Sequence, residues 1–298
     1  MLTSRKRLVL IAVASLLVLE LVTRFLLIPR SGDLVRLDGY SRQADSLQRC
    51  GGVSVALVGN STAEMGIDTE SLLNDLRALG VPEPCLAAFL ADASGMTTWR
   101  AMLRHYFWSR GKRADVVVLV GSGPDFHDEG SPDAGRLGRY LTSGGEWRAL
   151  LTTDSLPLHT RADALLSSLS ATFAARRKLM RRLQAYLPSP RGGPGGNPAR
   201  PASHALAEVL AKARADGTNV LIVLFPVREE ASPDPEIVER IAAGGAQLLD
   251  LREGTGLQAG DYADKYHLRP PGRTTLTRQL AAPLAHSMQA APAGTQGP

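Results

Sequence analysis

The sequence predicts an α/β protein: a doubly wound, flavodoxin-like domain with three α/β/α layers around a five-stranded parallel sheet, preceded by one transmembrane helix. Short aliphatic runs alternate with stretches of helical pattern, which favours parallel strands joined by helices. These runs are nearly continuous in Val, Leu, Ile and Ala, as is typical of strands buried on both faces. An apolar run behind a basic N-terminus predicts the membrane helix.

The composition is that of a folded domain and argues against a nucleic-acid partner. The 298 residues are 44% hydrophobic and 21% charged, which is enough to bury a sizeable core. The first thirty residues contain five basic side chains and one acidic side chain. Most of the net charge of +5 therefore lies there, and the rest of the chain carries only +1. The chain after residue 30 is so close to neutral that it does not have the basic surface that nucleic-acid binding requires.

Residues 1–30 are expected to form an uncleaved signal anchor. The basic stretch SRKR precedes the uncharged run Leu8–Leu19, and apolar residues then continue to Ile28. This run has the length of a membrane-spanning helix, in which Glu20 and Arg24 can pair on one face. Positive charge before the run predicts a cytoplasmic N-terminus and an exported body, periplasmic or extracellular. A cleaved signal peptide is the alternative, although no small-residue cleavage site follows the apolar core.

The rest of the chain divides into a connecting segment at 31–49, a domain at 50–290 and a flexible tail at 291–298. The expected strands are Val53–Val58, Cys85–Leu90, Val116–Gly121, Asn219–Phe225 and Ala246–Leu251. The expected helices are Thr62–Leu79, Thr97–Trp108, Ser203–Asp216 and Pro235–Ala243, with a last one after Gly272. In such a sheet, binding sites form beyond the carboxyl ends of the strands.

One long interruption of this pattern, at about 126–202, is predicted to be an insertion in the domain. It contains an apolar and basic helical stretch with the cluster RRKLMRR, followed by a segment rich in Pro and Gly. The basic cluster fits either the solvated face of a helix or a surface for anionic lipid or glycan.

The two cysteines are placed to form a disulfide. Cys50 precedes the first strand and Cys85 opens the second, so both thiols lie at the same end of the sheet if these strands are parallel neighbours. An exported domain reaches an oxidising compartment, where such a bridge forms. The alternative is a pair of buried free thiols.

Three polar side chains are predicted to meet at the carboxyl edge of the sheet. Ser61 follows the first strand, either as the N-cap of a helix or as a nucleophile near helix amides that stabilise an oxyanion. His267 follows the fifth strand and can take the serine proton, while Asp264 can hold the other ring nitrogen. Asp261 is a competing orienter, and the alternative for His267 is an ordinary histidine of a surface loop.

These residues resemble the sequence blocks of the SGNH (GDSL-like) hydrolases. The blocks are GNS at 59–61, GID at 66–68, ASGMTT around Gly95, GSGPD at 121–125 and DKYHL at 264–268. Their order and strand context match from Val53 to the last helix. The resemblance implies a triad of Ser61, His267 and Asp264, with the amides of Ser61 and Gly95 as the oxyanion hole.

The third block departs from the family pattern. Where the family has an asparagine side chain ahead of the aspartate, this chain has Gly123 and Pro124, so that donor to the oxyanion is absent. Loss of one such donor typically costs about 10²–10³ in rate. Ser122 is the candidate substitute donor.

The resemblance implies an exported, membrane-anchored serine esterase or O-acyltransferase that acts on the acyl ester of a small molecule or a surface polysaccharide. No cofactor and no metal ion are expected. The alternative is a catalytically inactive domain of this fold that serves as an anchored binding or assembly component in envelope polysaccharide modification. A weaker candidate for a metal site is the cluster PDFHDEG, with Asp125, His127 and Asp128. The other histidines stand singly, without metal-ligand spacing: His105, His159, His204 and His286.

Overall fold

The computed structural model describes residues 4–127, 133–142, 147, 158–184, 204–228, 235–252 and 254–290. The chain forms two compact units. The sheet unit consists of residues 39–130 and 199–298, and the helical unit consists of residues 1–38 and 131–198. The predicted tail at 291–298 lies outside the described residues.

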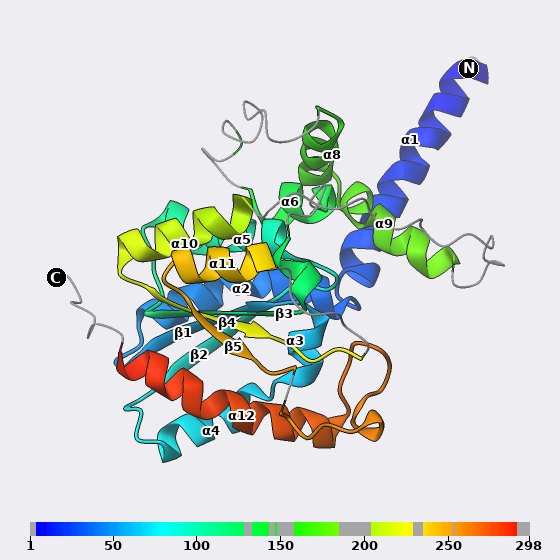
Figure 1. Ribbon diagram of the computed structural model, residues 1–298. Helices are drawn as coiled ribbons and strands as arrows, with labels where there is room; N and C mark the ends of the chain where they lie inside the picture. Colours follow the sequence, from blue (N-terminus) through cyan, green and yellow to red (C-terminus); the bar gives the residue numbers. More distant parts are fainter. Residues whose placement is uncertain are drawn as a thin grey trace. The chain divides into compact units, whose positions relative to one another are not determined.

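The sheet unit contains a five-stranded parallel sheet with the strand order β2-β1-β3-β4-β5 (Figure 1). Its strands are β1 (Ser54–Gly59), β2 (Cys85–Leu90), β3 (Val116–Gly121), β4 (Asn219–Leu224) and β5 (Gln247–Asp250). The predicted doubly wound fold is confirmed, and every strand boundary lies within one residue of its expected position.

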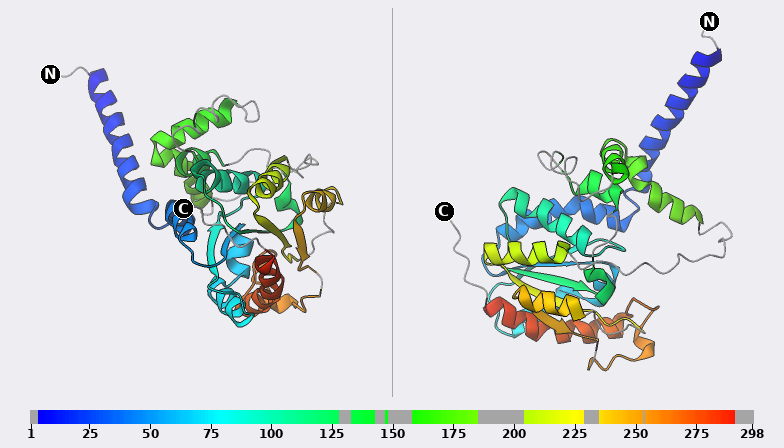
Figure 2. Two further views of the ribbon diagram at one scale, coloured as in Figure 1. Left: turned by 90° about the vertical axis from the view of Figure 1, so that its left-hand side faces the viewer. Right: turned by 45° about the horizontal axis from the view of Figure 1, so that its top comes forward.

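Helices cover both faces of this sheet and complete the three layers (Figures 1 and 2). On one face α4 (Thr69–Ala78) packs against α12 (Pro270–Gln289). On the other face lie α5 (Met96–Tyr106), α10 (His204–Asp216) and α11 (Pro235–Ala243). The last helix begins at Pro270, because two prolines occupy its first turn, where no backbone donor is needed.

The single helix predicted at Thr62–Leu79 is wrong, because two helices occupy this range. The first is α3 (Ser61–Gly66), and Asp68 then accepts hydrogen bonds from two backbone amides of the next turn and starts α4. Gly66 lies so close to Phe225 that a Cβ atom there would stand 2.1 Å from the ring. The break therefore lets α3 end against the sheet while α4 takes a new direction.

The connecting segment predicted at 31–49 is mostly helical, as α2 (Gly32–Gln48). Tyr40, in the part that belongs to the sheet unit, has no exposed surface and packs against Phe89. Its hydroxyl donates to the carbonyl of Leu90 at 2.6 Å and accepts from the amide of Leu90 at 2.7 Å. The segment is polar in sequence, and a single tyrosine within it gives no periodic signal of burial. That one tyrosine nevertheless holds the end of β2.

The prediction that the strands are buried on both faces is confirmed for β1 and β3 and is wrong for β5. Every residue of β1 and β3 is buried, and aliphatic residues from these strands form the core together with side chains of α4 and α12. Most of β5 is exposed, because it pairs with β4 only and forms an edge of the sheet.

Cys50 and Cys85 form a disulfide in which the Cα atoms are 6.1 Å apart. The parallel register aligns Ser54 of β1 with Cys85, which brings the residues just before β1 to the same end of the sheet. This decides between the bridge and the free thiols that the sequence left open.

Thiol titration checks the disulfide. The denatured, unreduced protein is expected to show no reactive thiol, and the reduced protein two, because the chain contains only these two cysteines. A Cys50→Ala variant should show one thiol without reduction, which controls for access of the reagent. Two thiols in the unreduced wild-type protein would contradict the bridge.

The helical unit contains α1 (Ser4–Val22), which continues into the π-helical turn η1 (Thr23–Leu27). Its other helices include α6 (Ala134–Tyr140), α8 (Leu158–Leu169) and α9 (Ala171–Gln184). In the described part of the chain, one helical stretch, Lys6–Leu27, is long and apolar enough to cross a membrane. This agrees with the predicted anchor, and a signal sequence has the same length and composition.

Candidate active site

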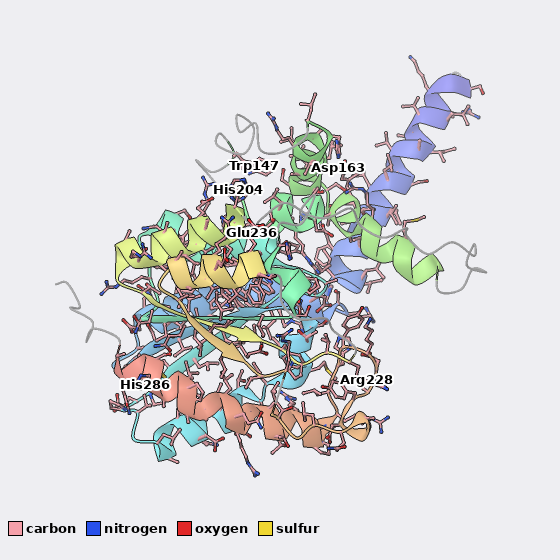
Figure 3. All side chains as sticks on the ribbon, viewed as in Figure 1. Trp147, Asp163, His204, Arg228, Glu236 and His286 are labelled. Atoms are coloured by element: carbon pink, nitrogen blue, oxygen red, sulfur yellow. A yellow bond between two sulfur atoms is a disulfide. The ribbon has the colours of Figure 1, made fainter. Side chains whose placement is uncertain are left out.

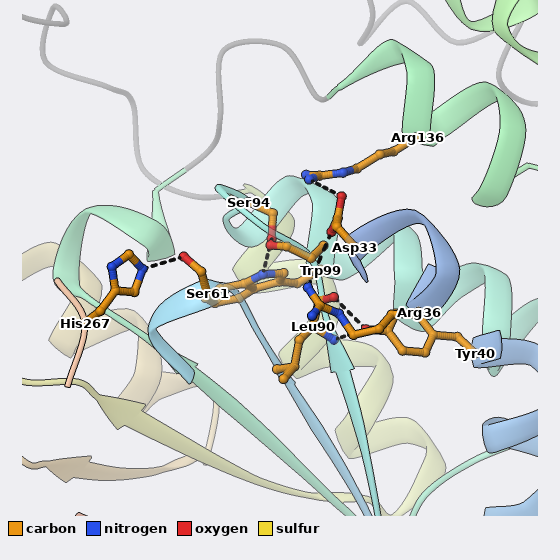
Figure 4. Close-up of polar contacts among 10 residues, drawn as sticks. Asp33, Arg36, Tyr40, Ser61, Leu90, Ser94, Trp99, Arg136 and His267 are labelled. Carbon is orange, nitrogen blue, oxygen red and sulfur yellow. Dashed lines mark hydrogen bonds and ion pairs between the residues drawn. The ribbon is translucent and has the colours of Figure 1, made fainter. Parts of the chain in front are cut away.

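Ser61 is the first residue of α3 and lies two residues after Gly59, the last residue of β1. The cap of this helix is Asn60, whose Oδ1 atom accepts a hydrogen bond from the Thr62 amide at 3.0 Å. The interpretation of Ser61 as a helix cap is therefore wrong. Its hydroxyl is turned toward a histidine instead (Figure 4).

A glycine at the end of β1 makes this position possible. A Cβ atom on Gly59 would lie 2.7 Å from the Ala63 side chain and 2.8 Å from the carbonyl oxygen of Val120. Because Gly59 has no side chain, α3 begins directly at the strand end and stays packed against the neighbouring strand β3. The serine is thereby held at the carboxyl edge of the sheet.

The three side chains predicted to meet lie in one hydrogen-bonded row. His267 Nε2 is 3.0 Å from Ser61 Oγ, and His267 Nδ1 is 2.7 Å from Asp264 Oδ2. Figure 4 shows the contact between the histidine ring and the serine. Serine and histidine are 206 residues apart in the chain, so only the fold brings them together.

The loop that carries Asp264 and His267 is fixed by its own backbone. Asp264 Oδ1 accepts from the amides of Tyr266 at 2.7 Å and His267 at 2.9 Å. The Ala263 amide donates to the carbonyl of His267 at 2.8 Å. One carboxylate oxygen therefore orients the loop while the other orients the imidazole ring.

The charge of Asp264 determines which ring nitrogen carries hydrogen. Its pKa is lowered to about 2, first by the hydrogen bond from His267 and then by the backbone amides that it accepts. An ionised carboxylate only accepts hydrogen bonds, so Nδ1 of His267 must be the donor. In the neutral ring, Nε2 then keeps a lone pair for the Ser61 hydroxyl, as a general base requires.

The titration of Asp264 can be followed by NMR of its carboxyl carbon. We expect a midpoint at about 2 instead of the ordinary value of 3.8. Because the pKa is lower in the folded than in the unfolded chain, these contacts stabilise the fold above the ordinary pKa, and this contribution is lost as the pH falls toward 2. His267→Ala should raise the midpoint, and an unchanged midpoint in that variant would contradict the assigned cause.

Asp261, the competing orienter, holds other groups. Its Oδ2 atom accepts from the Gln258 amide at 2.8 Å and caps the short 3-10 helix η4 (Ala259–Asp261). Its backbone carbonyl accepts from the Arg269 amide at 2.7 Å. The geometry therefore favours Asp264 over Asp261 as the partner of the histidine.

The amides of Ser61 and Gly95 are the ones expected to hold an oxyanion. Each comes directly after one of two residues, Asn60 and Ser94, that are hydrogen-bonded to each other. Asn60 Nδ2 donates to the carbonyl of Ser94 at 3.0 Å, and both residues are buried. Ser61 comes next after Asn60, and Gly95, the N-cap of α5, comes next after Ser94. The N-termini of α3 and α5, with their partial positive charges, are thus tied to each other. No role is predicted for Asn60 from the sequence, although asparagine is a favoured helix cap.

A buried tryptophan, Trp99, holds Ser94 in the position from which it contacts Asn60. Ser94 Oγ donates to the carbonyl of Ala91 at 2.6 Å and accepts from Trp99 Nε1 at 2.9 Å (Figure 4). The Trp99 ring stands 2.6 Å from the place that a Cβ atom of Gly121 would take. The sequence does not indicate this role of Trp99, because a tryptophan within an amphipathic helix is usually a core residue.

The third block forms a capped turn after β3. Ser122 is the N-cap of the 3-10 helix η3 (Gly123–Phe126), and both its amide and its hydroxyl donate to Asp125 Oδ2 at 2.8 Å. The single hydroxyl hydrogen of Ser122 is therefore directed at Asp125. The role of Ser122 as substitute oxyanion donor stays a prediction that requires this hydroxyl to turn.

Substitution of Ser122 tests that role. Because its hydroxyl is engaged with Asp125, we expect Ser122→Ala to lower kcat by less than about tenfold, well below the usual 10²–10³ for an oxyanion donor. Thermal unfolding measured in parallel should show a loss of about 1 kcal/mol, typical of a lost cap. A loss of kcat in the full range of an oxyanion donor would identify Ser122 as the substitute.

Among the residues that the structure describes, no group of three or more His, Cys, Asp or Glu side chains is placed to hold a metal ion. In the cluster PDFHDEG, the Asp125 carboxylate accepts from the amide and hydroxyl of Ser122, and Asp128 lies outside the described residues. The remaining histidines lie in four different helices: His105 in α5, His159 in α8, His204 in α10 and His286 in α12.

The fold and the site together define a doubly wound α/β protein with a serine, histidine and aspartate constellation at the carboxyl edge of its sheet. No protein-family model and no curated protein matches the sequence. Among solved structures, the chain is similar to an α/β hydrolase enzyme from the metagenome of Lake Arreo. The identity is 12% and the TM-score 0.43, over 83% of this chain and 100% of that one.

Two further similarities are of the same order. A catalytic mutant of an acetylxylan esterase from Geobacillus stearothermophilus has 8% identity and a TM-score of 0.41, over 80% of this chain and 94% of that one. A lipase/acylhydrolase from Enterococcus faecalis has 12% identity and a TM-score of 0.40, over 78% and 96%. Because these values are low, the case for a catalytic site rests on the contacts within this chain.

Proposed function

We propose that the protein is a serine esterase or O-acyltransferase of the SGNH (GDSL-like) type, held at a membrane by its N-terminal helix. The observation that carries the proposal is the row Asp264, His267 and Ser61, with contacts of 2.7 and 3.0 Å. The family blocks GNS, GID and DKYHL contain these side chains or the turns that position them. Nucleophile, base and orienter are in the roles that acyl transfer requires.

The first half of the reaction acylates the serine. His267 Nε2 takes the Ser61 proton as Oγ attacks the acyl carbonyl carbon, and Asp264 stabilises the imidazolium that forms. The amides of Ser61 and Gly95 hold the negative charge on the carbonyl oxygen. The tetrahedral intermediate collapses when the alcohol leaves with the proton from His267.

The second half transfers the acyl group from Ser61. His267 takes a proton from the incoming hydroxyl, which attacks the acyl-enzyme, and returns that proton to Ser61 as the intermediate collapses. Water as the acceptor gives an esterase, and the hydroxyl of a sugar gives an O-acyltransferase. Product analysis with and without a glycan acceptor distinguishes the two.

The location of the site favours an acylated surface polysaccharide over a soluble ester. The span Lys6–Leu27 begins within the basic stretch SRKR, and its uncharged run follows from Leu8; this order of charges supports a cytoplasmic N-terminus and an exported domain. The bridge between Cys50 and Cys85 supports the same side of the membrane, because disulfides persist in oxidising compartments. An enzyme tethered there meets envelope polymers at high local concentration, whereas a small acyl ester could be reached equally well by a soluble enzyme.

A fluorophosphonate probe, which reacts with activated serines, tests the proposed function. The full-length protein in detergent is expected to be labelled, and Ser61→Ala is expected to lose the label. Ser94→Ala is not a suitable control, because the Ser94 hydroxyl donates to the carbonyl of Ala91 and accepts from Trp99 beside Gly95. Ser168→Ala is a better one, since this serine lies in α8 of the helical unit. Absence of label on the folded wild type, or equal labelling of Ser61→Ala, would overturn the proposal.

The second candidate is a catalytically inactive domain that acts as an anchored component of envelope polysaccharide modification. The observation that favours it is the third block, where Gly123 and Pro124 replace the asparagine donor and the Ser122 hydroxyl is directed at Asp125. This candidate predicts an unlabelled protein that binds an acylated glycan equally well as wild type and as Ser61→Ala.

A further inference from the structure

Helix α8 of the helical unit buries small and polar side chains and exposes its leucines. Its buried side chains are small or polar: Thr160, Ala164 and Ser167 are each at most 2% exposed. Its leucines face outward, with exposed fractions of 42% to 78%: Leu158, Leu165, Leu166 and Leu169. The helical spacing places these leucines on one side of α8, opposite the buried residues. In water, an amphipathic helix would be turned the other way.

Close packing between helices explains why the leucines do not turn inward. A Cβ atom on Gly138 of α6 would lie only 1.9 Å from the carbonyl oxygen of Ala164. The backbones of α6 and α8 therefore nearly touch, and only small side chains fit between them. The leucines are left as an apolar stripe without a partner from α6.

The segment that follows α8 is hydrogen-bonded to the apolar span Lys6–Leu27 through Glu20, a residue of α1. The Glu20 carboxylate accepts from the Ser170 hydroxyl at 2.8 Å and from the amides of Ala171 at 2.7 Å and Thr172 at 3.0 Å. The Thr172 hydroxyl also donates to the hydroxyl of Thr23 at 3.0 Å. The junction of α8 and α9 is thus attached to the span itself, one residue after Leu169.

This attachment sets the depth of the stripe. Glu20 precedes Leu27, the end of the span, by seven residues, which at about 1.5 Å per residue is about 10 Å of helix. Interfacial helices bury their apolar faces about 5–10 Å into the boundary between headgroups and acyl chains. If α1 crosses a bilayer, Leu169 therefore lies at that boundary.

We propose that the leucine stripe of α8 (Leu158, Leu165, Leu166 and Leu169) lies in the outer boundary of the bilayer that α1 spans and contacts lipid acyl chains. The protein then has a second membrane contact beside its anchor. This inference depends on the anchor of the proposed function and not on catalysis, so failure of fluorophosphonate labelling would leave it standing.

The bilayer is favoured over a second copy of the chain by continuity and by charge. The stripe begins beside a helix whose own apolar side chains are exposed along its length, so one apolar medium covers both. Helix α9 follows directly, and its sequence ATFAARRKLMRRLQ contains basic residues and no acid. Such a helix complements anionic headgroups, whereas two copies would bring like charges together.

Spin labelling in phosphatidylcholine and phosphatidylglycerol vesicles tests the proposal with the full-length chain. Leu165→Cys and Leu169→Cys are labelled singly, and only the new thiol reacts because the native cysteines are bridged. Accessibility to oxygen, which partitions into acyl chains, is compared with accessibility to a water-soluble nickel chelate. Leu16→Cys in α1 is the control for lipid. Leu79→Cys, which is 44% exposed at the end of α4, is the control for water.

At both α8 positions the ratio of oxygen to nickel accessibility is expected to be several-fold higher than at Leu79 and to approach that at Leu16. A ratio equal to that at Leu79 would overturn the proposal and leave the stripe in water. Low accessibility to both reagents would place it against protein. Dipolar broadening that disappears on dilution with unlabelled chain would identify a second copy as the occupant. Two labelled positions guard against a local disturbance at either one.

Discussion

His267→Ala is expected to lower kcat by about 10⁵- to 10⁶-fold, the size of effect seen when the histidine of a serine triad is removed. His267→Ala removes the base that stands 3.0 Å from Ser61 Oγ and the acid that protonates the departing alcohol. Residual activity would come from the oxyanion amides alone. The measurement is the steady-state hydrolysis of an activated acetyl ester, and fluorophosphonate labelling should be lost in parallel.

A histidine on the same C-terminal part of the chain provides the matched control. His286 lies in α12 and is exposed (Figure 3), so His286→Ala should leave kcat unchanged. Far-UV circular dichroism of both variants should match that of the wild type. A wild-type rate in a folded His267→Ala variant would remove this residue from the mechanism.

Asp264→Asn is expected to lower kcat by about 10⁴-fold while preserving the fold, because such a change leaves the geometry intact and selects the wrong tautomer. The asparagine amide can donate to Nδ1, so the ring hydrogen moves to Nε2 and points at the serine. The Asp264 side chain is 54% exposed, so its replacement adds no buried polar group. The loss should appear in kcat much more than in KM.

Asp261→Asn is the control that separates the two acids of the loop. Its carboxylate caps η4 through the Gln258 amide, so the variant should lose some stability and keep kcat within several-fold. An equal loss in both variants would show that loop order, and not the Asp264 charge, controls the rate. A large loss for Asp261 alone would assign the orienting role to that residue.

Much of the fold could be predicted because its signals are local. Runs such as Val116–Gly121 are apolar enough to be central strands, and their alternation with helices leaves few topologies open. The errors arose where one side chain overrides a pattern. Asp68 restarts a helix that looked continuous, and Tyr40 draws a polar segment into the core.

The capping residue and the supports of the site could not be predicted in the same way. Ser61 and Asn60 are both favoured caps, and the choice between them depends on where β1 ends and how closely α3 approaches β3. The contact from Asn60 to Ser94 joins two strand ends and requires the register of β1 with β2.

The sequence by itself determined the chemical groups of the site: a serine after the first strand, a histidine and an aspartate after the fifth, and no asparagine in the third block. It also determined the apolar span at the N-terminus. Tertiary structure decided that Ser61 and His267 meet across 206 residues, and that Asn60 frees the serine from capping. The physical reason is that parallel strands bring their carboxyl ends to one edge, and close packing there, as at Gly59, fixes distances that no local pattern contains.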